Sequence, residues 1–472
     1  MRKITNRQLG LFVGPLLFIL VLVATAYSSL PMPARVVAAT AVLMTSWWLT
    51  EAIPIPATAL LPLALFPVFH VSSMQNVATS YANHLIFLFL GGFLVAASIQ
   101  RWNLHKRIAL NLIVRIGSSP ARIILGFMLA SAFLSMWVSN TATAMLMLPI
   151  GMALIQQINN LSEATPFGSA LMLGIAYACS IGGVATLVGT PPNAIFAGIA
   201  EEELKITIGF FEWFRFAFPM ALAFLIICWY YLVHIRFKLN KMVIQSDKQI
   251  LLDELNHLGK VSSNEKRVLL VFLFTALAWV LNGILHIEIL KDVKDSTIAI
   301  VAACALFIIP AHGENKRLLD WETARNIPWD ILILFGGGFA LAAACSHSGL
   351  MDWLADQLTI LKSVNELVLI IAVTTMVIFL TEITSNTATA TIFIPLMLAL
   401  ATAVNLKPFL LMLPVAIAAS YAFMLPVATP PNAIVFSSRQ LDIMTMAKTG
   451  FALNLIAILI IVVTIWFFKP LM

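Results

Sequence analysis

The sequence Ser-Asn-Thr-Ala-Thr-Ala occurs twice in this chain, at 139–144 and again at 385–390. Both copies lie in sequence that is otherwise almost wholly apolar, and they are 246 residues apart. Polar side chains are rare in such surroundings, because an amide or hydroxyl is costly in hydrocarbon unless it has a partner. The repetition therefore predicts one binding site to which two copies of a structural unit each contribute.

Two shorter sequences recur in the same order as the longer one. Gly-Gly-Phe at 91–93 returns 246 residues later at 337–339. Thr-Pro-Pro-Asn at 190–193 returns 239 residues later at 429–432. Three sequences that recur in one order at nearly constant intervals indicate that the chain consists of two repeats.

The composition assigns the chain to the membrane. Hydrophobic residues make up 61% and charged residues 11% of the sequence, and the mean hydropathy is +0.96, outside the range of soluble domains. The apolar runs are continuous, so they predict an all-α polytopic membrane protein and not a β-barrel. Eleven crossings are expected, at about 10–28, 36–50, 55–70, 84–100, 168–200, 214–235, 268–286, 296–311, 329–346, 408–438 and 450–468. The first run follows Arg2, Lys3 and Arg7 and is interpreted as a retained helix.

Several function classes do not fit the sequence. The net charge of +6 comes from basic residues at the ends of apolar runs, which favours the positive-inside rule over nucleic-acid binding. The four cysteines lie in apolar segments without metal-ligand spacing, so we expect them to pack structurally. Known catalytic and phosphate-binding motifs are missing from the sequence, and we expect no enzymatic activity.

The repeated Ser-Asn-Thr sequences predict two re-entrant hairpins. Between Arg122 and Glu163 lie 40 uncharged residues, twice what one crossing needs, with Asn140 near the middle. The second copy is similar, since Glu382 is the only charge between Glu366 and Lys407. Two crossings joined by a tight turn would also fit the length. A hairpin whose tip stops at mid-membrane is favoured because the tips carry apolar flanks instead of charges or Gly/Pro.

The repeated Thr-Pro-Pro-Asn sequences predict two broken helices. Proline lacks an N–H and disfavours helix in the preceding residue, so paired prolines end a helix. Inside a membrane the freed carbonyls need protein, water or an ion as partner. We therefore expect unwound stretches at 189–192 and 428–431.

Charge bias predicts that the repeats are inverted. The segment after the first Gly-Gly-Phe is basic, whereas the segment after the second is mostly acidic. These residues are Arg101, Lys106, Arg107, Arg115 and Arg122 in the first, and Asp352, Asp356, Lys362 and Glu366 in the second. The first exit is thus expected in the cytoplasm and the second outside, with a cytoplasmic N-terminus and an external C-terminus.

This division gives four segments. An N-terminal helix is expected at 1–35, and repeat 1 at 36–236 with its hairpin at about 120–158 and its broken helix at about 168–200. A cytoplasmic loop follows at 237–267. Repeat 2 is expected at 268–472, with its hairpin at about 366–405 and its broken helix at about 408–438.

The chemistry of such tips suits a cation-coupled anion transporter. Helix N-termini offer N–H groups and partial positive charge to an anion, and carbonyls with Ser, Thr and Asn oxygens suit Na⁺. Neither tip contains Lys or Arg, so bound cations and helix dipoles would balance a bound anion. Obligatory coupling to the cation is the expected consequence.

The paired Ser-Asn-Thr sequences, the second-half Thr-Pro-Pro and the duplicated hairpin order resemble the divalent anion–sodium symporter family, the INDY-type dicarboxylate transporters. The likeness extends from about residue 36 to the end. It implies a homodimer with a scaffold domain and a mobile transport domain, working by an elevator motion in the plasma membrane. It also implies C4 dicarboxylates such as succinate, malate and fumarate as substrates, with citrate or sulfate in some branches, and Na⁺ as coupling ion without an organic cofactor.

The resemblance also implies the site residues. A first Na⁺ site would use Ser135, Ser139, Asn140 and Gly189, and a second would use Thr381, Asn386 and Ala428. The substrate carboxylates would contact Asn140, Thr141, Asn386 and Thr387, with Thr429 and Pro430 lining the pocket. Glu382 has Met136 as its counterpart, so it is left out of the symmetric site, and a structural and an electrostatic role remain open for it.

Within the same family an exchanger that swaps di- or tricarboxylates without Na⁺ is the alternative function. Retention of both oxygen-rich tips favours the symporter, because an exchanger could place a fixed positive charge where a cation would sit. A channel would need a pore lined along its whole length, whereas the sequence shows only a site near the middle of the membrane.

Overall fold

The computed structural model describes residues 6–117, 119–159, 165–239, 249–285, 293–313 and 316–468. Within these ranges the chain is helical and contains no strand. The first half comprises α1 (Asn6–Ala24), α2 (Met32–Thr50), α3 (Ile55–Thr58), α4 (Leu61–Val68), α5 (Met74–Tyr81), α6 (His84–Arg101), α7 (Leu104–Ile116), α8 (Pro120–Ser135), α9 (Asn140–Asn159), α10 (Pro166–Val184), α11 (Pro191–Leu204) and α12 (Phe210–Tyr230), which continues as one π-helical segment (Tyr231–Arg236). The second half comprises α13 (Gln249–His257), α14 (Ser263–Leu285), α15 (Asp295–Ile308), α16 (Trp321–Ala324), α17 (Trp329–His347), α18 (Leu350–Leu358) with a 3-10 turn (Thr359–Ser363), α19 (Glu366–Thr381), α20 (Asn386–Ala403), α21 (Phe409–Ala418), α22 (Pro430–Phe436) and α23 (Ile443–Phe468).

Many of these helices have the length and apolarity of membrane spans. Eight helices among the described residues are long and apolar enough to cross a membrane, and shorter apolar helices accompany them. Each of the eleven expected spans coincides with one helix or with a pair of helices separated by a short break. The prediction of an all-α polytopic membrane protein is confirmed.

The expected span at 55–70 is interrupted. The run 55–70 forms two short helices, α3 and α4, in place of one crossing helix. Pro62 lacks the N–H that would bond to the carbonyl of Thr58, which interrupts the helix here. The neighbouring carbonyl of Ala59 accepts a hydrogen bond of 2.5 Å from the hydroxyl of Tyr81 on α5. The break is therefore fixed by a contact with the following helix.

The two hairpins have matching helices. In the first, α8 ends at Ser135 and α9 begins at Asn140. In the second, α19 ends at Thr381 and α20 begins at Asn386. All four of these positions obey the 246-residue interval, so the same short turn separates the two arms of each hairpin.

Both broken helices are interrupted ahead of their prolines. In the first, α10 ends at Val184 and α11 begins at Pro191, while in the second α21 ends at Ala418 and α22 begins only at Pro430. The interruptions are thus longer than the expected stretches at 189–192 and 428–431, and they end before the prolines. The prolines are helical because the first turn of a helix does not need their missing N–H. The interruptions begin earlier because side chains supply partners for the freed backbone groups, as described below.

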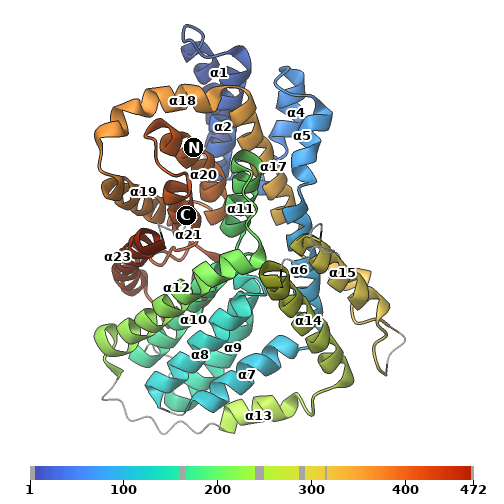
Figure 1. The fold of residues 1–472 in the computed structure, drawn as a ribbon. Coiled ribbons are helices and arrows are strands. Elements are labelled where there is room, and N and C mark those ends of the chain that lie inside the picture. The colour runs from blue at the N-terminus through green and yellow to red at the C-terminus, as the bar shows by residue number, and fades with distance from the viewer. Residues whose placement is uncertain are drawn as a thin grey trace.

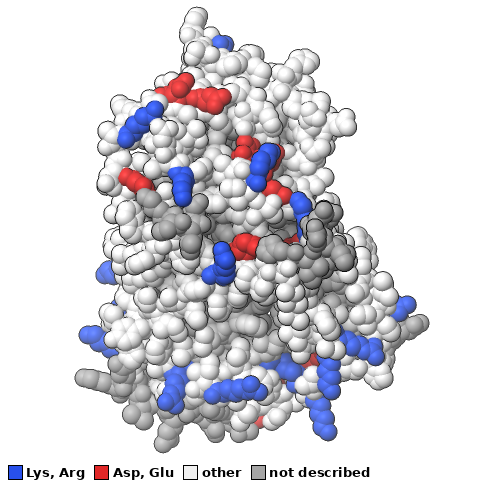
Figure 2. Space-filling model, viewed as in Figure 1, with Lys and Arg blue, Asp and Glu red and all other residues white. Residues whose placement is uncertain are grey.

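The halves of the molecule lie in opposite senses. In Figure 1, α7, which follows the first Gly-Gly-Phe helix α6, lies in the lower part with α8, α9 and α13, whereas α18, which follows α17, lies across the upper part. Figure 2 shows Lys and Arg gathered along the lower end, while the acidic residues concentrate higher. The segment boundaries at 36–236, 237–267 and 268–472 stay a prediction, and residues 1–5 and 240–248, which contain Arg2, Lys3 and part of the expected loop, lie outside the described residues.

The repeated glycines allow close packing of equivalent helices. A Cβ on Gly91 of α6 would lie 2.6 Å from the backbone of Ala299 on α15. A Cβ on Gly337 of α17 would lie 2.3 Å from the carbonyl oxygen of Ala59. Backbone approaches this close exclude any side chain, which explains why glycine recurs at this position in both halves.

Candidate functional site

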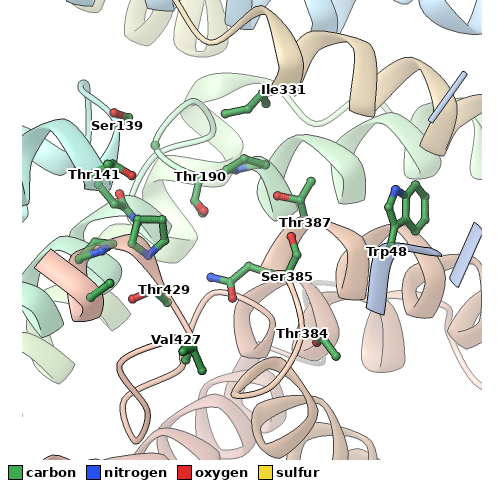
Figure 3. A pocket seen from close by; sticks show the side chains of 18 of the residues that line it. Trp48, Ser139, Thr141, Thr190, Ile331, Thr384, Ser385, Thr387, Val427 and Thr429 are labelled. Carbon is green, nitrogen blue, oxygen red and sulfur yellow. The ribbon is translucent and has the colours of Figure 1, made fainter. Parts of the chain in front are cut away.

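A cavity of about 550 Å³ lies between the two hairpin tips and the two helix breaks. It is lined by Ser139, Asn140 and Thr141 of the first tip and by Ser385, Asn386 and Thr387 of the second. Figure 3 shows Ser139 and Thr141 on one side of this cavity and Ser385 and Thr387 on the other, with Thr190 between them. Residues 246 positions apart in the sequence thus face one space.

The structure brings together every residue that the resemblance implied for substrate contact. These six residues, Asn140, Thr141, Asn386, Thr387, Thr429 and Pro430, all line the cavity. Of the implied sodium ligands, Ser139, Gly189 and Ala428 line it as well. The roles of these residues stay predictions, but their common location is a property of the fold.

Ser135 and Thr381 do not line the cavity and are fully buried behind the tips. The hydroxyl of Ser135 donates toward the amide oxygen of Asn140 and lies 2.8 Å from the carbonyl oxygen of Cys179. The hydroxyl of Thr381 lies 2.8 Å from the amide oxygen of Asn386 and 3.0 Å from the carbonyl oxygen of Ala419.

Each of these clusters contains more oxygen than protons. A hydroxyl supplies one proton, and here it faces two acceptors at once. Three oxygen atoms with one proton among them form the kind of neutral, oxygen-rich environment that a hard cation accepts. Both halves therefore contain an oxygen cluster directly behind an asparagine of the tip.

Four helices begin at residues that line the cavity. These are α9 at Asn140, α11 at Pro191, α20 at Asn386 and the short α22 at Pro430. The unpaired N–H groups and the helix dipole make each N-terminus favourable for negative charge. Among the described residues that line the cavity there is no Lys or Arg, and Glu51 is the one acid, which pairs with Arg7 at 3.0 Å. The cavity is thus suited to an anion without a fixed cationic side chain.

The asparagines of the Thr-Pro-Pro-Asn sequences hold the breaks in place. The side-chain amide of Asn193 donates to the carbonyl of Thr186 at 2.8 Å and approaches that of Gly183 at 3.3 Å. The amide of Asn432 donates to the carbonyls of Ala422 and Leu425, both at 3.0 Å. The Thr-Pro-Pro-Asn pattern predicted the two breaks but not the role of these asparagines. An Asn directly after two prolines was the available signal.

Glu382 supports the second break. Its carboxylate accepts hydrogen bonds from the backbone N–H groups of Phe423, Met424 and Leu425, at 2.7, 2.9 and 3.1 Å. The side chain of Asn454 on α23 donates to it as well, at 2.8 Å. These contacts favour the structural role over the electrostatic one, because a carboxylate with four donors already has its partners.

Several lining residues come from outside the repeated tips. Trp48, Glu51, Phe89, Phe93 and Ile331 close the cavity on the side of α2, α6 and α17. Phe93 belongs to the repeated Gly-Gly-Phe, so its recurrence was a signal for it. The other four carry no motif, and only the folded chain brings them to the site.

The geometry of paired tips and breaks has counterparts among known proteins. A family model described as the sodium:sulfate symporter transmembrane region matches residues 6–472. The chain belongs to the divalent anion–sodium symporter family. Members of this family are membrane transporters and not enzymes, so the prediction of no enzymatic activity is confirmed.

Relatives within the family are similar over nearly the whole chain. A sodium-dependent dicarboxylate transporter SdcS from Staphylococcus saprophyticus is 45% identical over 98% of this chain and 92% of its own length. The protein of the same name from Staphylococcus aureus strain MRSA252 is 44% identical over 99% of this chain and 92% of its own length.

Two solved structures share the fold at low sequence identity. The YdaH transporter of Alcanivorax borkumensis has a TM-score of 0.57 at 12% identity and covers 93% of this chain and 99% of its own. MtrF of Neisseria gonorrhoeae has a TM-score of 0.56 at 13% identity and covers 94% of this chain and 96% of its own. At this identity the likeness concerns the arrangement of helices alone.

Proposed function

We propose that this protein is a secondary transporter that carries C4 dicarboxylates such as succinate, malate and fumarate into the cell together with Na⁺, by an elevator mechanism. The observation that carries the proposal is the cavity itself. Four helices begin there, its described lining residues include no Lys or Arg, and an oxygen cluster lies behind each tip. The sodium-dependent dicarboxylate transporters among its relatives support this substrate class and this coupling ion.

The charge balance of the cavity supplies the reason for coupling. A dicarboxylate brings two negative charges into a space whose only compensation is partial helix charge. Cations bound behind Asn140 and Asn386 would supply the missing positive charge within a few ångströms. An empty pair of cation sites would then leave the dianion bound weakly, which links the two flows.

The packing of the helices supports a mobile unit of the elevator type. α10 packs against α8, α9, α12 and α22, and α21 packs against α19, α20, α23 and α11. Hairpins, broken helices and the helix that follows each break would therefore form one body that holds both tips and both oxygen clusters, while α2, α6 and α17 complete the wall of the anion cavity. Helices α2 to α6 and α14 to α17 would form the scaffold against which this body moves.

The proposal also includes a location in the plasma membrane and a homodimeric state. The basic lower end in Figure 2 favours the cytoplasmic side for that end of the molecule. The cytoplasmic N-terminus and the external C-terminus stay predictions from the sequence. A homodimer is part of the proposal through the family resemblance, and cross-linking in membranes tests it.

Transport in liposomes tests the function directly. The purified protein is reconstituted and uptake of labelled succinate is measured with external Na⁺ or with choline in its place. We expect saturable uptake with Na⁺ and little with choline. Asn140→Ala and Asn386→Ala should each remove most uptake, whereas Ser131→Ala on α8, a buried hydroxyl away from the cavity, should retain it. Undiminished uptake in choline would contradict Na⁺ coupling.

The Na⁺-independent exchanger of the same family is the second candidate. Its one supporting argument is that a one-for-one exchange of dicarboxylates moves no net charge, so that no coupling cation is needed. Counterflow distinguishes it: liposomes loaded with unlabelled succinate and free of Na⁺ should accumulate label if the protein exchanges, and should not if it is a symporter.

A further inference from the structure

A second cavity continues the anion cavity toward one face of the protein. It has a volume of about 990 Å³ and shares Phe93, Ser139, Thr141, Ile331 and Pro430 with the anion cavity. Its outer part is lined by Arg101 at the end of α6 and by residues at and around α16. We call this cavity the open vestibule, because its wall is continuous with the site.

A third cavity of about 480 Å³ lies at the other end of the scaffold helices and shares no lining residue with the anion cavity. It is lined by α5 and by the end of α17, and Glu202 near the end of α11 forms part of its wall. Polar groups are frequent in this wall, including Asn76, Ser80 and His347. We call it the isolated cavity.

The isolated cavity and the open vestibule have equivalent walls. Five residues of one correspond to five of the other at the 246-residue interval that relates the two repeats. These pairs are Asn76 with Glu322, Val77 with Thr323, Ser80 with Asn326, Ala343 with Ala97, and His347 with Arg101. Two cavities built from equivalent positions of inverted repeats are expected to serve opposite faces of the membrane.

The contact between α11 and α17 separates the isolated cavity from the site. Pro191 at the start of α11 lines the anion cavity, and Glu202 near its end lines the isolated cavity. Between them a Cβ on Gly198 would lie 2.3 Å from the ring of Phe339, which is fully buried. Phe339 is the counterpart of Phe93, the residue that lines both the anion cavity and the open vestibule.

A hydrogen bond and an ion pair hold the end of α11 in this position. Glu201 contacts His84 at the start of α6 at 2.5 Å and Lys294 beside α15 at 2.8 Å. The neighbouring Glu202 has one carboxylate oxygen that is buried without a hydrogen-bond partner. The end of α11 is therefore tied to the scaffold while one of its carboxylates remains unsatisfied.

We propose that the isolated cavity is a second vestibule for the dicarboxylate, closed in this structure by α11, and that the contact between Gly198 and Phe339 is its gate. The inference rests on the proposed function, since it assigns the route by which the same anion reaches the same site from the opposite face. When the body that carries α11 moves, Gly198 separates from Phe339 and Glu202 leaves the wall. His347 then stands at the mouth in the place that Arg101 has in the open vestibule.

Cysteine labelling at one equivalent pair tests the assignment. Ala343→Cys and Ala97→Cys are made in a Cys304→Ala background, because Cys304 is exposed and the other three native cysteines are buried. A membrane-impermeant, anionic thiol reagent is applied to right-side-out and to inverted membrane vesicles. We expect Ala97→Cys to react from one face and Ala343→Cys to react from the other, with substrate and Na⁺ present to allow movement.

A variant of the gate supplies the second measurement. Gly198→Ala overpacks the closed contact, so labelling of Ala343→Cys should become about tenfold faster. Gly92→Ala is the matched control, because a Cβ there meets nothing closer than 3.8 Å and labelling should not change.

Two results would overturn the assignment. One is reaction of both cysteines from the same face, and the other is no reaction of Ala343→Cys from either face even with Gly198→Ala. Succinate uptake is measured in the same vesicles. Opposite-sided labelling without Na⁺-dependent uptake would refute the proposed substrate and coupling while leaving the second vestibule in place.

Discussion

Ser135 and Thr381 have the same environment although they are 246 residues apart. Each hydroxyl faces the amide oxygen of the asparagine five residues later and a backbone carbonyl of the neighbouring broken helix. The two halves of the chain therefore repeat their hydrogen bonds as well as their sequence, and this equivalence leads to the first prediction.

Ser135→Ala and Thr381→Val should each raise the Na⁺ concentration needed for half-maximal succinate uptake. Each removes one of three clustered oxygen atoms, and the loss of a ligand of this kind should weaken Na⁺ binding about tenfold or more. The measurement is uptake as a function of Na⁺ at fixed succinate. Thr381→Ser, which keeps the hydroxyl, is the control, and an unchanged Na⁺ dependence in Thr381→Val would argue against a cation behind the second tip.

Gly189→Ala should disrupt the first break. A Cβ at this position would lie 2.3 Å from the carbonyl oxygen of Gly183, a backbone atom that cannot move aside cheaply. Overpacking of this kind costs on the order of 1–3 kcal/mol, so we expect a lower melting temperature and lost uptake. The counterpart of Gly189 is Ala428, where Ala428→Gly adds no atom, and that variant should keep most activity. Melting in detergent and succinate uptake are the two measurements.

Glu382→Gln should lower the stability of the fold and leave the Na⁺ dependence of uptake nearly unchanged. The amide oxygen can still accept some of the bonds from Phe423, Met424 and Leu425, but the charge-assisted part is lost. A decrease in the free energy of unfolding of about 1–3 kcal/mol is expected, seen as a lower melting temperature. The Na⁺ dependence of the uptake that remains should match that of the unchanged protein. A strongly shifted Na⁺ dependence with an unchanged melting temperature would instead support an electrostatic role for Glu382.

The closed position of α11 should depend on pH through Glu202. Burial, helped by the charges of Glu203 and Glu201 and opposed by Lys205, raises the pKa of this carboxyl to about 7. The closed state thus binds the proton more tightly than a state in which Glu202 reaches water. The stability that this proton gives to the closed state is fully present below the ordinary pKa of 4.5. It is lost as the pH rises toward about 7 and changes little above that.

Labelling of Ala343→Cys reports this dependence. Measured from about pH 5 to about pH 8 and corrected for thiolate reactivity with a free thiol, the rate should rise with pH. Because His347 lines the same cavity and Glu203 is adjacent in the chain, Glu202→Gln is the decisive comparison and should flatten the curve. A curve of unchanged shape in Glu202→Gln would show that another group controls the contact.

The sequence revealed those parts of the site that are repeated. Duplication marked Asn140 and Asn386, and paired prolines marked the two breaks, because both signals depend on local chemistry. Trp48 and Ile331 could not be found this way, since an apolar residue that lines a cavity has the same sequence context as one that packs in a core. The break between α3 and α4 was missed because the apolar run continues across it. Pro62 within this run was the available signal, and the contact of Tyr81 with Ala59 fixes the break.

The helices that follow the two breaks are unequal in length. α11 has 14 residues and α22 has 7, so two further turns of helix, ending in three glutamates, stand on one side of the site without an equivalent on the other. The electrochemical gradients of the transported ions set how far the dicarboxylate accumulates, and this inequality cannot alter that limit. It makes the two directions of travel kinetically unlike: an anion that arrives from the α11 side has to wait for an acidic helix to withdraw, while one that leaves past α22 meets no such obstacle.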